Sequence, residues 1–335
     1  MTRLLAIGDV HIKLSNLEDI ELFLEKIKIT ITNERPDFII ILGDVLNTFE
    51  RIHTTCLSYA QRLFTVCSEY TQTYVLVGNH DYISNSQFLT SHHWMTPFST
   101  WNQLTIVDRV VSFTHEKNHF VLCPYVPDGR LVEALSTFPE WLSAHMIFGH
   151  QLLNGAKMGA ILAEHVEEWK QEYPFLCCGH IHDKQRVQSN LYYTGTPMQD
   201  SFAEKRSKSI ALFTVHEKEF EIKEIELGVN IKRIEYMSVS DAYTYQIELK
   251  QNEMLRLTLK GTKEECHVFK KTTEFKKLSS LAKIVFDEIQ MELIQEKENG
   301  IFQDVLIESI KHDFFLTQLY KKHASLSYEP EIQFM

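Results

Sequence analysis

Short apolar segments that end in polar clusters recur through the first two thirds of the chain and constrain its fold most. They alternate with segments whose apolar residues recur every three or four positions. This alternation is typical of layered α/β domains. We expect strands at 3–9, 37–44, 73–81, 119–126, 145–150, 175–182, 191–197, 209–215 and 219–227. We expect helices that cover a sheet at 17–32, 54–70 and 158–173.

The composition indicates an ordinary globular protein. Of the 335 residues, 44% are hydrophobic and 24% are charged, which suffices for one large domain and one or two small ones. The formal net charge of −11 argues against a protein that coats nucleic acid by charge alone. Any contact with DNA must therefore be local, centred on a metal, or shared with a partner.

The chain has no sequence feature of a secreted or membrane protein. No apolar run approaches the roughly 20 residues of a membrane-spanning helix, and the N-terminus lacks a signal-peptide pattern. The six cysteines form no Cys-x-x-Cys pair. We therefore expect a cytoplasmic or otherwise intracellular, reducing location, without secretion and without a membrane partner.

The character of the sequence changes at about residue 229, where Lys and Glu begin to alternate with apolar residues. We expect one domain at 1–228 and a small α+β capping domain at 229–298. The second would contain strands at 254–261 and 281–289 and a helix at 263–280. An amphipathic pattern at 301–323 predicts a C-terminal helical segment at 299–335.

Five polar clusters, each preceded by glycine, stand at the ends of predicted strands. They are Gly8-Asp9-Val10-His11, Gly43-Asp44, Gly78-Asn79-His80-Asp81, Gly149-His150 and Gly179-His180-Ile181-His182. Each alone is common in ordinary turns. Strand ends on one edge of a sheet converge on one crevice, so the five together predict a single site.

The chemistry of these clusters predicts a pair of divalent metal ions. We assign Asp44 as the bridging ligand, Asp9, His11 and His182 to one ion, and Asn79, His150 and His180 to the other. Alternate residues of a strand face the same side, so His180 and His182 can both point into the site. Carboxylate, amide and imidazole ligands favour Mn²⁺, with Fe²⁺, Zn²⁺ and Mg²⁺ as alternatives.

The order Gly-Asp-x-His, Gly-Asp, Gly-Asn-His-Asp, Gly-His, Gly-His-x-His resembles the calcineurin-like metallophosphoesterases over about residues 1–228. The resemblance implies a four-layer α/β/β/α sandwich, the ligand set above and hydrolysis of phosphoesters. It also implies that His80 is a catalytic acid that protonates the leaving oxygen, with Asp81 as a second catalytic residue that orients it.

A second resemblance concerns the substrate. The segment YTGTPMQDSFAEKRSKSIALF (193–213) resembles the Tyr-x-Gly-Ser-Pro, Ser-Phe-Gly-Glu and Lys-Gly signature of SbcD-type nucleases. The small α+β domain and helical tail follow the same order as in that family, and the length is closer to compact phage or viral versions. This implies an exonuclease and endonuclease that processes DNA ends in double-strand-break repair or recombination. It would act as a homodimer with an SMC-like ATPase of the SbcC type, bound through the helical tail.

A stand-alone phosphodiesterase or phosphatase acting on nucleotides or small phosphoesters is the alternative, because the metal-binding clusters alone do not choose a substrate.

The candidate substrate contacts depart in part from the family pattern. Asn47 stands where family members commonly have His or Asp, and His53 could replace that contact or simply begin a helix. Lys205 and Arg206, with Lys208, could contact DNA phosphates or form a solvated turn. Ala203 and Ser209 replace two glycines of the nuclease signature.

Overall fold

The structure is a computed structural model that describes residues 1–49, 51–217 and 219–289, and six residues between 305 and 316. These residues form two compact units. The larger unit comprises 1–235, 246–257 and 281–283, and the smaller one comprises 236–245, 258–280 and residues from 284 onward.

The larger unit contains two six-stranded sheets. The first has the order β14-β13-β1-β2-β3-β4. Its strands are β1 (Thr2–Ile7), β2 (Phe38–Ile41), β3 (Thr73–Leu76), β4 (Leu104–Val107), β13 (Ile210–His216) and β14 (Glu219–Ile225). Strands β1 to β4 are parallel, and β13 and β14 continue the sheet in antiparallel pairing. The central strands are almost wholly apolar because both of their faces are buried.

The second sheet has the order β11-β12-β10-β7-β6-β5. Its strands are β5 (Val111–His115), β6 (Asn118–Leu122), β7 (Met146–His150), β10 (Phe175–Gly179), β11 (Gln185–Gln188) and β12 (Leu191–Tyr193). The four inner strands are parallel, and the two edge strands are antiparallel to their neighbours.

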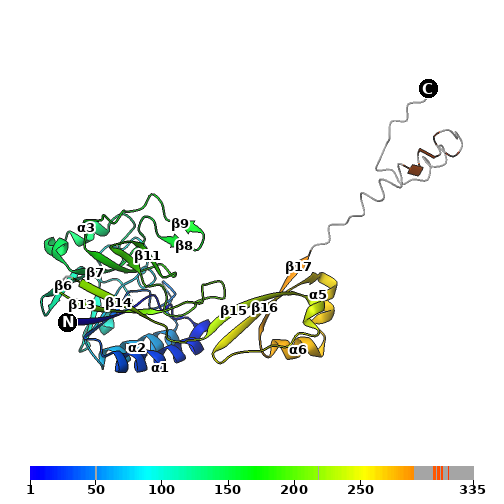
Figure 1. Ribbon diagram of the computed structural model, residues 1–335, viewed down its shortest axis with the longest axis horizontal. Helices are drawn as coiled ribbons and strands as arrows, with labels where there is room; N and C mark the ends of the chain where they lie inside the picture. Colours follow the sequence, from blue (N-terminus) through cyan, green and yellow to red (C-terminus); the bar gives the residue numbers. More distant parts are fainter. Residues whose placement is uncertain are drawn as a thin grey trace. The chain divides into compact units, whose positions relative to one another are not determined.

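Hydrophobic clusters between and outside the sheets define four layers. Side chains such as Leu4, Ile40 and Phe148 fill the space between the two sheets. Helices α1 (Leu17–Glu34) and α2 (Thr54–Ser68) cover the outer face of the first sheet, at the positions predicted for helices. Helix α3 (Leu131–Leu135) and irregular segments cover the second sheet, on the opposite side from α1 and α2 (Figure 1). The predicted four-layer sandwich is thus confirmed.

The helix predicted at 158–173 is wrong. The chain forms a small hairpin there, β8 (Lys157–Met158) and β9 (Ile161–Leu162), and continues without a helix. Gly159 has φ +61° in the hairpin turn. Trp169 is buried against the second sheet from an irregular segment. The apolar spacing in this region therefore reflects individual packing contacts and not a helical face.

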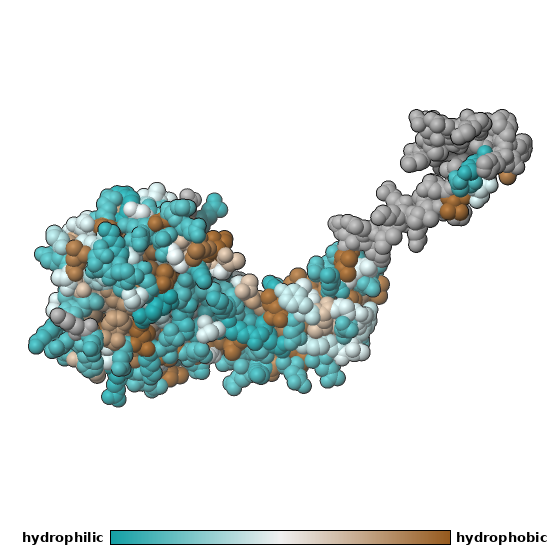
Figure 2. Space-filling model, turned by 45° about the horizontal axis from the view of Figure 1, so that its top comes forward, coloured by the Kyte–Doolittle hydropathy of each residue, from teal (hydrophilic) through white to brown (hydrophobic). Residues whose placement is uncertain are grey.

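Three short 3₁₀ helices complete the larger unit, η1 (Leu14–Asn16), η2 (Thr96–Phe98) and η3 (Pro139–Ser143). The face of this unit shown in Figure 2 is mostly hydrophilic, with scattered hydrophobic residues. All six cysteines are buried and unpaired. In the described part of the chain, no helix is long and apolar enough to cross a membrane.

The C-terminal third contains the predicted α+β elements. A three-stranded sheet has the order β15-β16-β17, formed by β15 (Ile231–Ser238), β16 (Glu253–Thr262) and β17 (Lys283–Ile289). The predicted single helix is two short ones, α5 (Lys263–Phe269) and α6 (Thr273–Ser279), after a shorter α4 (Val239–Ala242). Thr262 and Thr272 cap α5 and α6, so each starts its own helix.

The predicted domain limits at 228 and 298 stay predictions. The predicted helical segment at 299–335 lies largely outside the described residues. Of the six described residues in it, residues 305, 306, 308, 309 and 316 are helical and residue 311 lies in a turn.

Candidate active site

Most of the predicted metal ligands lie in loops just beyond the strand ends. Strand β1 ends before Asp9, β2 before Asp44, β3 before Asn79 and β10 before His180, whereas His150 is the last residue of β7. His11, Asp44 and His180 have φ values of +48°, +48° and +79°. A left-handed backbone is uncommon for residues other than glycine and costs about 1–3 kcal/mol each. The prediction that strand alternation points these side chains into the site was therefore wrong. The turns beyond the strand ends direct them there instead.

Close approach of two loops explains one of the glycines. A Cβ atom at Gly78 would lie 2.2 Å from Asp44 Oδ1 and 2.4 Å from the Asp44 nitrogen. Such contacts cannot be relieved without moving the backbone of one loop. Glycine at this position thus allows the loop after β3 to pack directly on the loop after β2.

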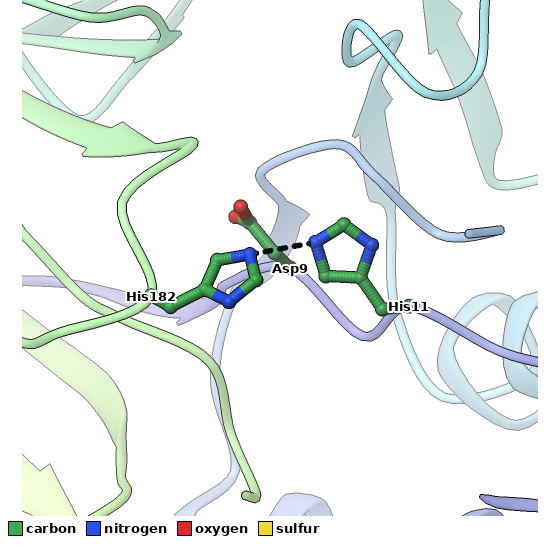
Figure 3. A group of neighbouring side chains, drawn as sticks. All are labelled: Asp9, His11 and His182. Atoms are coloured by element: carbon green, nitrogen blue, oxygen red, sulfur yellow. Dashed lines mark hydrogen bonds between the residues drawn. The ribbon is translucent and has the colours of Figure 1, made fainter. Parts of the chain in front are cut away.

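Asp9, His11 and His182 form the first group of ligand atoms, all within 4.8 Å of one another. Figure 3 shows the rings of His11 and His182 facing each other with the Asp9 carboxylate beside them. Their Nε2 atoms are 3.0 Å apart. Asp9 also accepts the backbone N–H of His180, at 2.9 and 3.1 Å from its two oxygens.

Asp44, His150 and His180 form the second group, which Asn79 joins. Asn79 Oδ1 lies 3.1 Å from His150 Nε2 and 2.8 Å from His180 Nδ1. Asp44 Oδ2 lies 3.4 Å from His150 Nε2 and 3.8 Å from His11 Nε2, so this carboxylate reaches both groups. The structure thus brings the seven predicted ligands together and places Asp44 between the two halves.

The facing ligand atoms fit a pair of cations. His11 Nε2 and His182 Nε2 can share only one proton, and the buried Nδ1 of His11 has no hydrogen-bond partner among the described residues. Burial lowers the pKa of His11, which favours the neutral ring that binds metal. Oxygen and imidazole nitrogen without thiolate are suitable donors for Mn²⁺, Fe²⁺ or Zn²⁺, and they do not decide which ion is bound.

The pKa values of the second group follow from its charges. Burial alone would lower the pKa of His150, but Asp44 and Asp9 raise it to about 9. Burial and the neighbouring His150 lower the pKa of His180 to about 3. A proton on His150 therefore stands where a cation would neutralise Asp44, and metal binding would displace that proton.

His80 lies beside the ligand groups and contacts the loop that follows β2. Its backbone N–H donates to Asp44 Oδ1 at 2.9 Å, and its Nδ1 lies 3.3 Å from the Asn47 carbonyl oxygen. The ring of Phe49 stacks on it, with centroids 4.6 Å apart and planes 24° apart. The bond at Nδ1 leaves Nε2 as the nitrogen that can exchange a proton with a substrate.

Asp81 links the loop after β2 to the loop after β3 through hydrogen bonds. It accepts hydrogen bonds from the backbone N–H groups of Gly78 (3.0 Å), Leu46 (3.3 Å) and Val45 (3.4 Å), and from Trp94 Nε1 (3.0 Å). Burial and the charge of Asp44 raise its pKa to about 7, against the effect of these donors. In the structure the ring of His80 is held by Asn47 and Phe49, and the orienting role of Asp81 stays a prediction.

Glu204 is a site residue to which the sequence analysis assigned no role. Its Oε1 accepts from His182 Nδ1 at 3.1 Å, its Oε2 is 2.9 Å from Lys208 Nζ, and the backbone N–H of Asp200 donates to Oε2 at 3.0 Å. Burial alone would raise its pKa, but the bonds from His182 and Lys208 lower it to about 2. A carboxylate bonded to Nδ1 fixes the tautomer and direction of a metal-binding imidazole.

Three of the predicted substrate-binding residues are a helix cap, a lysine in an ion pair and an exposed arginine. His53 caps α2 by accepting the backbone N–H of Thr55 at 3.2 Å, so it begins a helix. Lys205 is paired with Asp183 at 2.9 Å, and Lys208 Nζ donates to the His182 carbonyl at 2.9 Å. Arg206 is exposed. The two lysines of this segment therefore have acidic partners within the chain.

Comparison with known proteins identifies the class. Residues 2–184 match the calcineurin-like phosphoesterase family, and the chain belongs to this family. It is a metal-dependent phosphoester hydrolase, and the Asp/His cluster is its candidate dinuclear metal site.

Two viral relatives share most of the chain. Protein 078R of Invertebrate iridescent virus 3, named as a phosphoesterase, is 42% identical over 82% of this chain and 80% of its own length. Protein 244L of Invertebrate iridescent virus 6, also named as a phosphoesterase, is 36% identical over 80% of this chain and 97% of its own length. Among solved structures, the phosphoesterase YfcE from E. coli aligns with 68% of this chain and 100% of its own, at 15% identity and a TM-score of 0.32.

Proposed function

We propose that this chain is the nuclease subunit of a DNA-end-processing complex and hydrolyses phosphodiester bonds in DNA. The supporting observation concerns Glu204, which lies within the segment 193–213 that resembles SbcD-type nucleases. This residue bonds to His182, one of the predicted metal ligands. The segment that suggests DNA as the substrate thus contacts a predicted metal ligand.

The residues of the chain divide the proposed reaction between them. When bound, two divalent ions supply positive charge for the phosphate and acidify a water molecule so that hydroxide is accessible near neutral pH. Asp9, His11, His182, Asp44, Asn79, His150 and His180 would hold these ions. A water oxygen bonds to phosphorus as the P–O bond to the departing nucleoside breaks, and the leaving oxygen takes a proton from His80 Nε2.

The proposed partner is an SMC-like ATPase of the SbcC type, bound by a homodimer of this chain. This part of the proposal rests on the sequence resemblance and on the α+β sheet of β15, β16 and β17. Copurification of the full-length chain with such an ATPase is the expected result. Copurification that persists after removal of residues 299–335 would contradict docking through that segment.

Hydrolysis of nucleotides or small phosphoesters remains the second candidate function. The ion pairs of Lys205 with Asp183 and of Lys208 with Glu204 favour it, because they occupy two cations that could otherwise contact DNA phosphates. The net charge of −11 favours it for the same reason.

Digestion assays with Mn²⁺ separate the two functions. The purified chain should shorten linear duplex or single-stranded DNA, and an Asp44→Asn variant prepared in parallel should not, which excludes a contaminating nuclease. Turnover of mononucleotides and small phosphomonoesters without any cleavage of DNA would contradict the nuclease proposal and support the alternative.

A further inference from the structure

A pocket of about 660 Å³ opens beside His80, and none of its described lining residues is a predicted metal ligand. Its lining residues are Asn47, Thr48, Phe49, Ile83, Ser84 and Asn85. They continue the two loops that carry Asp44 and His80, so the pocket is fixed next to the catalytic acid by the chain itself. It is an open depression, so a flat group could lie against its wall without being enclosed.

The lining is uncharged and partly apolar. None of the six described lining residues is acidic or basic. Phe49 and Ile83 leave 37% and 52% of their surfaces exposed, although both are large hydrophobic side chains. Such a lining offers a poor environment for a second phosphate and a good one for a flat, uncharged group.

Residues that line the pocket contact His80 on one wall and Tyr125, which lies near His180, on the other. Phe49 stacks on His80, and Asn47 supplies the carbonyl that holds the same ring. On the other wall, the Tyr125 hydroxyl donates to the Asn85 carbonyl at 3.5 Å, while its ring stacks near His180 with centroids 6.1 Å apart. A leaving group that takes a proton from His80 would therefore have this pocket beside it.

We propose that this pocket binds the nucleobase of the leaving nucleoside, stacked on the ring of Phe49. The inference rests on the proposed phosphodiesterase function and deepens it, because it assigns the group that departs. The side-chain amides of Asn47 and Asn85 suit the polar edge of any base, so stacking would give affinity with little sequence preference.

Hydrolysis of matched substrates tests the proposal. Two phosphodiesters would share one reacting phosphate, one with a thymine on the leaving nucleoside and one with an abasic sugar there. Wild-type protein should prefer the base-containing substrate by about tenfold in kcat/KM, the size of one base–aromatic stack. Phe49→Ala should reduce that ratio to about one, and Phe49→Tyr should keep it. Using a ratio within each variant removes any effect of Phe49 on His80 itself.

A ratio near one in the wild-type protein, or an unchanged ratio in Phe49→Ala, would overturn the pocket assignment. A binding measurement keeps it testable if no phosphodiester is hydrolysed. With 4-fluorophenylalanine at position 49 of the full chain, thymidine should shift the ¹⁹F resonance and deoxyribose 5-phosphate should not. Equal shifts, or none, would reject the proposal even where the phosphodiesterase assignment holds.

Discussion

The His80 side and the His182 side of the site differ in what surrounds their histidines. Phe49, Asn47 and the uncharged pocket surround His80. His182 lies beside charged groups. Its partner Glu204 pairs with Lys208 and accepts the backbone N–H of Asp200. The Asp200 carboxylate pairs with Lys13 at 2.6 Å. Both histidines have Nδ1 held by an oxygen, a carbonyl at His80 and a carboxylate at His182.

This difference matches two roles of imidazole, metal binding and proton transfer. A carboxylate on Nδ1 increases the basicity of the ring and suits a permanent metal ligand. A neutral carbonyl on Nδ1 orients the ring and leaves Nε2 free to face a substrate, which suits a residue that transfers a proton. The comparison therefore predicts that mutations on the two sides will impair different steps.

Removal of His80, the proposed acid, should give the largest effect. His80→Ala should lower kcat for DNA by about 10²–10⁴-fold, because the leaving alkoxide loses its proton donor. The number of bound Mn²⁺ ions should stay the same. For a p-nitrophenyl phosphodiester the loss should be much smaller, since that leaving group departs without a proton. Steady-state kinetics on both substrates and metal analysis of the purified variants measure these effects.

His92→Ala is the matched control, because His92 is an exposed histidine in a nearby loop. It should retain wild-type rates on both substrates. An equal loss for DNA and for the p-nitrophenyl ester in His80→Ala would contradict the acid role, and loss of metal would make His80 a ligand.

The contrast also shows what the sequence could predict. The ligands were predictable because each lies at or just beyond the end of a strand and most stand directly after a glycine. Helix α1 was predictable because Ile20, Phe23, Leu24 and Ile27 form one buried face. The contact of Glu204 with His182 spans 22 residues without a local pattern. The stacking of Phe49 on His80 depends on how two loops meet. The helix prediction at 158–173 was wrong because apolar residues there, such as Trp169, are buried although the segment is irregular. Local periodicity indicates elements, whereas contacts between loops require the fold.

Loss of the carboxylate behind His182 should give the next largest effect. Glu204→Gln should weaken one of the two metal sites by about 10–100-fold, because the His182 ring loses its anionic partner. The other site should keep its affinity. A two-site calorimetric titration with Mn²⁺ resolves this difference. Lys205→Ala, which breaks an ion pair in the same segment without touching a ligand, should leave both sites unchanged. Equal weakening of both sites would show that Glu204 supports the segment and not the ligand.

The pH dependence of stability should give the smallest effect. The pKa of Glu204 is about 2 in the folded protein, below its ordinary value of 4.5. The carboxylate therefore stabilises the fold above about pH 4.5, and this contribution disappears as the pH falls toward 2. Allowing for partial exposure, it amounts to about 1–2 kcal/mol.

Thermal unfolding of wild type and Glu204→Gln should accordingly show a gap in Tm at pH 6 that narrows by pH 3. Glu21→Gln breaks an exposed ion pair with Arg62, in which Glu21 is 54% exposed, and should show a smaller gap at pH 6. A gap for Glu204→Gln that stays constant from pH 6 to pH 3 would mean that its bonds to His182 and Lys208 stabilise the fold little. The order of the His182 side would then come mainly from packing.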